Sequence, residues 1–70
     1  MQKIKIPKGY KLNVECHKAE DGPATHLILS KLVSGDIRYF LFEILENNNL
    51  NQISTSQTPA KLYQIIWPQT

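Results

Sequence analysis

Apolar and polar residues alternate along the first part of the chain. From Tyr10 to His17 every second residue is apolar and the residues between are polar or charged, a period of two that is typical of a half-buried β-strand. Ile4 and Ile6 alternate with lysines in the same way, until Pro7-Lys8-Gly9 favours a turn. The sequence therefore predicts an extended N-terminal segment, a turn and a strand.

Two further apolar segments follow, joined by a short link. Residues 37–46 are rich in aromatic and β-branched side chains, which favour a strand. Residues 25–33 have two interpretations, because Pro23 and Gly35 are placed to begin and end a helix as well. We favour a strand there, since the Ser-Gly-Asp link to the next segment is typical of a hairpin.

The last third of the chain consists of a polar segment followed by a shorter apolar one. Residues 47–58 are mostly Asn, Gln, Ser and Thr, and we predict a polar loop there. In the segment that follows, Thr58 and Pro59 suit the start of a short helix, whereas Tyr63 and Trp67 are strand formers. The prediction is one mainly β domain over residues 1–70, a four- to five-stranded antiparallel meander or small barrel. The alternative is an α+β fold with a short C-terminal helix packed on the sheet.

The strand predicted over residues 37–46 is apolar on both faces. One face carries Ile37, Tyr39, Leu41 and Leu45. The other face carries Phe40, Phe42 and Ile44. An antiparallel sheet with one solvent-exposed face would show polar residues at every second position. Each large apolar side chain left in water also loses about 1.5–3 kcal/mol of stabilisation by burial. A second covering layer is therefore required, either the C-terminal segment or another polypeptide.

Charge and cysteine content narrow the class of protein. The net charge is +2, but residues 1–11 carry four lysines and no acid, while residues 12–46 carry six acids against three basic residues. No apolar run approaches the roughly 18 residues of a membrane span, and the N-terminus lacks the apolar stretch of a secretory signal. Cys16 is the single cysteine and cannot form an internal disulfide, so we expect a cytoplasmic protein.

The chain shows no motif for catalysis or metal binding. Cys16 and His17 are adjacent, and neighbours on a strand point to opposite faces, so they do not form a nucleophile and its base. Together with His26 they also lack the ligand spacing of a zinc site. We predict a protein that is not an enzyme and has no cofactor, metal or small-molecule substrate.

Two kinds of partner suit such a domain. We expect a protein-binding module that inhibits or modulates another protein or binds a second copy of itself, with contacts from Phe40, Phe42, Ile44, Tyr63 and Trp67. The alternative is a small nucleic-acid-binding β-barrel that uses Lys3, Lys5, Lys8, Tyr10, Lys11 and Arg38. Frequent Ile, Asn and Lys with a single Arg indicate an AT-rich source, such as a phage or mobile element.

Overall fold

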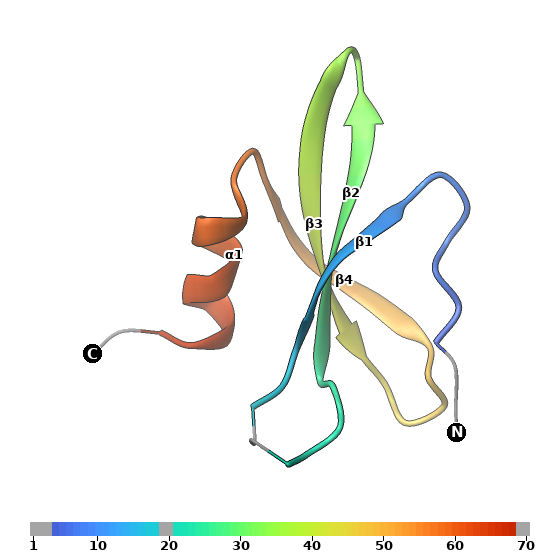
Figure 1. Ribbon diagram of the computed structural model, residues 1–70, viewed down its shortest axis with the longest axis vertical. Helices are drawn as coiled ribbons and strands as arrows, with labels where there is room; N and C mark the ends of the chain where they lie inside the picture. Colours follow the sequence, from blue (N-terminus) through green and yellow to red (C-terminus); the bar gives the residue numbers. More distant parts are fainter. Residues whose placement is uncertain (1–3, 19–20, 69–70) are drawn as a thin grey trace.

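The computed structural model describes residues 4–18 and 21–68 as one antiparallel sheet and one helix (Figure 1). The elements are β1 (Lys11–Cys16), β2 (His26–Val33), β3 (Asp36–Ile44), β4 (Leu50–Ser56) and α1 (Pro59–Ile66). The strands pair in the order β1-β2-β3-β4. The chain thus adopts the open meander of the prediction rather than the barrel, together with the C-terminal helix of the alternative.

The turns form where the sequence places residues suited to them. The amide of Tyr10 donates a hydrogen bond to the carbonyl of Pro7 at 3.1 Å, and Gly9 has φ +90°, as the predicted turn requires. Between β2 and β3, Ser34 and Gly35 have φ of 52° and 86°, which is the two-residue hairpin turn that follows the right-handed twist of strands. The strand interpretation of residues 25–33 is therefore confirmed.

The loop predicted over residues 47–58 is wrong for most of its length, because it contains β4. This strand pairs with β3 from Leu50 opposite Ile44 to Ser56 opposite Tyr39. An edge strand is held mainly by its backbone hydrogen bonds to one neighbour. Most of its side chains can therefore stay in water, and the strand does not need an apolar residue at every second position. Residues 47–49 belong to the connection between β3 and β4.

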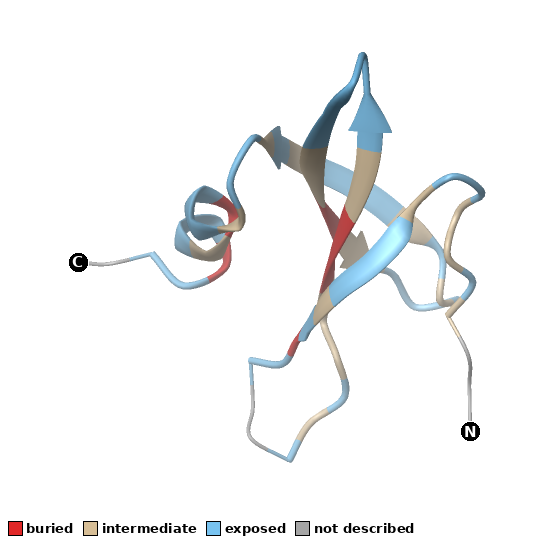
Figure 2. Cartoon of the chain, turned by 45° about the horizontal axis from the view of Figure 1, so that its top comes forward, coloured by how far each residue is buried: buried red, intermediate tan, exposed pale blue. Residues whose placement is uncertain are grey.

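Each face of the sheet carries its own hydrophobic cluster. On one face, Leu62 and Ile66 of α1 pack against Cys16, Ile28 and Leu41. Figure 2 shows the buried residues at the centre of the sheet and on the side of α1 turned toward it. This is why a helix of only eight residues is stable here, since such short helices are marginal without packing.

The hydrophobic cluster on the opposite face of the sheet is covered neither by the C-terminal segment nor by another polypeptide, the two covers that we predicted. Its buried residues are Leu27, Leu29 and Phe42. The partly buried side chains packed on them are those of Ile4, Ile6, Tyr10, Phe40, Ile44 and Leu50. The N-terminal segment, rather than the C-terminal segment or a second polypeptide, therefore covers the face of Phe42.

The helix begins and ends as its sequence suggests. Thr58 is the N-cap, Pro59 occupies the first turn, and the amide of Thr58 donates to Ser56 Oγ at 3.2 Å. At the other end the amide of Trp67 donates to the carbonyl of Tyr63 at 2.8 Å. Among the described residues there is no helix whose length and apolar character would allow it to cross a membrane.

Candidate functional site

β2 and β3 extend beyond their neighbours as a two-stranded arm. β1 pairs with β2 only as far as Ser30, and β4 pairs with β3 only as far as Tyr39. The arm, defined here as residues 31–38, therefore has no flanking strand within the described chain, and Figure 1 shows it standing out from the sheet. It is an element with two unpaired edges and a tight turn at its tip.

Large apolar side chains are exposed on the arm. Leu32 is 67% exposed, Ile37 58% and Val33 40%. Leu32 and Ile37 are direct partners across the ladder, so their side chains lie next to each other on one face. That face is the one that carries Leu41. The pair is thus an apolar continuation of this face beyond the part that α1 covers.

The arm also carries positive charge. Lys31 and Arg38 are direct partners across the ladder, on the face opposite to Leu32 and Ile37. Lys31 Nζ lies 5.0 Å from the centroid of the Tyr10 ring, a cation–π contact, and Arg38 Nε donates to Thr55 Oγ1 at 3.0 Å. Each cation has its own contact, which offsets the repulsion expected between like charges in this position.

The five residues predicted to contact another protein divide into two groups. Phe42 is buried, and Phe40 and Ile44 are partly buried in the same cluster, so these three side chains serve the chain's own packing. The rings of Tyr63 and Trp67 stack at the end of α1, with centroids 6.0 Å apart, and Trp67 is 43% exposed. Of the five, Trp67 offers the most open aromatic surface.

The exposed residues of the arm were not among the predicted contact residues. Alternation identifies a strand but does not show where its neighbours end, so Leu32, Val33 and Ile37 read as ordinary strand residues. One available signal was their position within three residues of a predicted hairpin turn, where a strand leads out into solvent.

The described residues predicted to bind nucleic acid lie on the N-terminal segment, at the start of β1 and on the arm. The ring of Tyr10 packs edge-on against Phe40 and Phe42, with centroids 5.2 and 5.7 Å away, and Lys31 lies over it. The ring is therefore occupied by contacts within the chain. Lys5, Lys8 and Lys11 are exposed on the N-terminal segment and at the start of β1. Lys3 lies outside the described residues.

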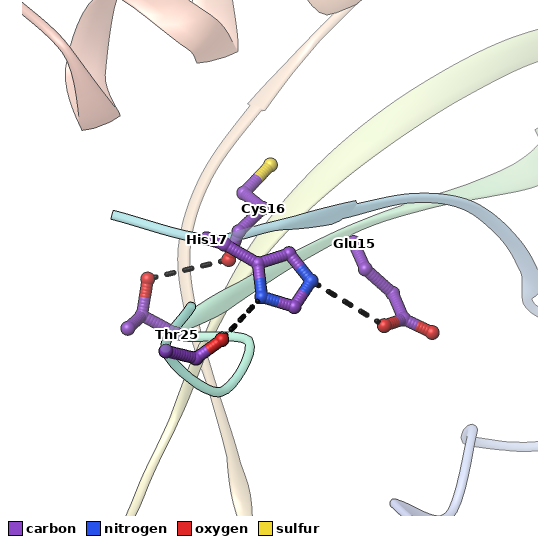
Figure 3. A network of polar contacts seen from close by, with 5 residues as sticks. Glu15, Cys16, His17 and Thr25 are labelled. Carbon is purple, nitrogen blue, oxygen red and sulfur yellow. Dashed lines mark hydrogen bonds and ion pairs between the residues drawn. The ribbon is translucent and has the colours of Figure 1, made fainter. Parts of the chain in front are cut away.

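Cys16 and His17 point in different directions at the end of β1 (Figure 3). His17 Nδ1 donates to the carbonyl of Gly22 at 2.9 Å, and its Nε2 lies 3.8 Å from Glu15 Oε1. The sulfur of Cys16 points away from the ring. The amide and hydroxyl of Thr25 both donate to the carbonyl of Cys16, at 2.8 and 3.3 Å. These contacts close the β1–β2 connection.

A row of three titratable residues crosses the same end of the sheet. Cys16 lies opposite His26, and His26 lies opposite Glu43. Burial raises the pKa of the Cys16 thiol, which disfavours the reactive thiolate. Burial and the charge of Lys18 lower the pKa of His26, against an opposing effect of Glu43. Within residues 4–18 and 21–68, no three His, Cys, Asp or Glu side chains are arranged to hold a metal ion.

A shallow groove of about 440 Å³ lies between the end of β4 and the start of α1. Arg38 and Lys61 line it together with hydroxyl side chains such as Ser54 and Ser56, and no acidic residue lines it. The groove is thus lined by basic and hydroxyl side chains, whereas the arm carries exposed apolar side chains. Comparisons of the chain with family models, with curated proteins and with solved structures found no match.

Proposed function

We propose that this chain is a non-catalytic protein-binding module that modulates or inhibits another protein, and that its arm is the docking surface. The observation that supports this most strongly is the exposed pair of Leu32 and Ile37 on a projecting hairpin. A domain of this size has little apolar surface to leave in water, and adjacent exposed apolar side chains are typical of interaction sites. The free thiol of Cys16 supports a cytoplasmic location.

The charges of the arm favour an acidic partner over a second copy at this surface. Lys31 and Arg38 lie on the arm and Lys11 lies at its base, against the single acid Asp36. A second copy carries the same excess of positive charge on its arm, so electrostatic complementarity favours a partner with acidic residues at this surface. A partner with an apolar patch for Leu32 and Ile37, and with acidic residues that reach the opposite face of the arm where Lys31 and Arg38 lie, would match both features.

Matched variants test this proposal by affinity capture from the source cells. Leu32→Ser/Ile37→Ser removes the exposed pair, and Leu12→Ser/Ile65→Ser is the control, because those two side chains are also exposed but lie off the arm. We expect the wild type and the control to retain the same acidic protein in stoichiometric amount. The arm variant should lose that protein while keeping its urea midpoint.

Two results would overturn the proposal. One is equal retention by the arm variant and the control, and the other is the absence of any stoichiometric protein. Nucleic acid is the alternative partner, and it would be identified by an affinity that falls steeply between about 50 and about 200 mM salt. Such a result would replace the arm with the lysines of the N-terminal segment as the site.

A further inference from the structure

β4 is an edge strand of the sheet that carries no charged residue. Its outer side faces no other strand of the described chain, and none of its residues from Leu50 to Ser56 is charged. The opposite edge, β1, carries Lys11 and Glu15, and charges are a common means of preventing a sheet edge from pairing with another strand. The protective feature that β4 does have is a bulge at Ile53, whose side chain is 42% exposed.

Opposite charges flank the two ends of this edge. At its C-terminal end, Arg38 and Lys61 line the groove beside α1. At its N-terminal end, Glu43 lies on the neighbouring strand, paired with Asn51, and Glu46 lies in the connection that leads into β4. The edge therefore runs from an acidic end to a basic end, with an uncharged strand between them.

We propose that a second copy of this chain pairs with β4 in the antiparallel direction, so that the two sheets join into one across a twofold axis. Antiparallel pairing reverses one copy relative to the other, so the basic end of each edge lies beside the acidic end of its partner. The uncharged middle of the strand meets itself without repulsion. This surface shares only Arg38 with the arm, and the proposal does not depend on the function proposed above.

The charges at the two ends of β4 also favour a second copy of this chain over an unrelated strand as the partner of the edge. An unrelated extended segment would need its own acidic and basic ends in the matching order, whereas a second copy has them by symmetry. The expected contact is small, since a standard interface buries about 800 Å² per partner and one short strand pair buries less. We therefore expect a weak dimer that forms as the protein concentration rises.

Sedimentation equilibrium of the full chain between about 10 and about 500 µM tests the proposal. The wild type should change from monomer to dimer over this range. Ile53→Lys places a charge at the centre of the edge and should remain a monomer throughout. Leu12→Lys makes the same kind of change at an exposed position on β1 and should dimerise as the wild type does.

A charge exchange tests the two ends of the edge. Lys61→Glu and Glu46→Lys should each weaken the dimer severalfold, and the double variant should restore it, because each reversed charge again faces an opposite one. Amide spectra establish that every variant is folded. A wild-type monomer at all concentrations, a dimer that survives Ile53→Lys, or a double variant weaker than both single variants would each overturn the proposal.

Discussion

At the residue scale, His26 links the stability of the fold to pH. It is partly buried on β2, where burial and Lys18 lower the pKa of its imidazole from the ordinary value of 6.5. The unfolded chain therefore binds the proton at a higher pH than the native chain does. Stability is complete above the unfolded pKa and is lost progressively as the pH falls from there toward the lower native pKa.

The urea midpoint should accordingly be lower at about pH 5.5 than at about pH 7.5, and His26→Gln should remove most of that difference. His17→Gln is the control, since His17 is the other histidine and is exposed at the end of β1. It should keep the pH dependence of the wild type. An unchanged pH dependence in His26→Gln would show that another group is responsible.

At the scale of the element, the β2–β3 hairpin depends on two residues with positive φ. A Cβ added at Gly35 meets nothing within 4 Å, so Gly35→Ala should cost only the strain of the left-handed backbone, about 1–2 kcal/mol. Ser34→Asn introduces a residue that tolerates this conformation and should raise the free energy of unfolding slightly. Urea unfolding measures both changes. Equal effects of the same sign would contradict this account of the turn.

The elements differ in how well the sequence predicted them, for physical reasons. β1 was predicted from its alternation of apolar and polar residues, β3 from its aromatic and β-branched side chains, and β2 from its short link to β3. β4 has only Leu50 and Ile53 as apolar residues, because a backbone ladder on one side is enough to hold it. The helix stayed an open alternative because its own residues favour both structures. Packing of Leu62 and Ile66 on the sheet decides it.

The candidate surfaces were harder to predict than the strands. Exposure of Leu32 and Ile37 follows from where β1 and β4 stop, and that depends on turns and register elsewhere in the chain. The same limit applies to Phe42, whose apolar surroundings were predicted but whose covering segment was not. The local sequence shows that an apolar side chain must be buried, whereas the tertiary structure determines which segment buries it.

At the scale of the whole molecule, the sheet lies between two unequal covers. The helix packs on one face through a regular apolar stripe, while the other face is closed by the irregular segment that precedes β1. Ile4 and Ile6 belong to this second cover, and their alternation with lysines is the same pattern that a strand would show. Their role follows only from the turn at Gly9, which directs the segment back over Phe42.

This arrangement makes the N-terminal segment part of the folding unit, and Ile4→Ser/Ile6→Ser tests that. Full burial of an isoleucine is worth about 1.5–3 kcal/mol, and a domain near 70 residues rarely has more than about 3–5 kcal/mol in total. Even at partial burial, the double variant should lose a large share of its stability and bind a hydrophobic dye. Leu32→Ser/Ile37→Ser, which removes two similar side chains that are already exposed, should lose little. Similar losses in the two variants would mean that the segment only rests on the sheet, and the face of Phe42 would then need a different cover.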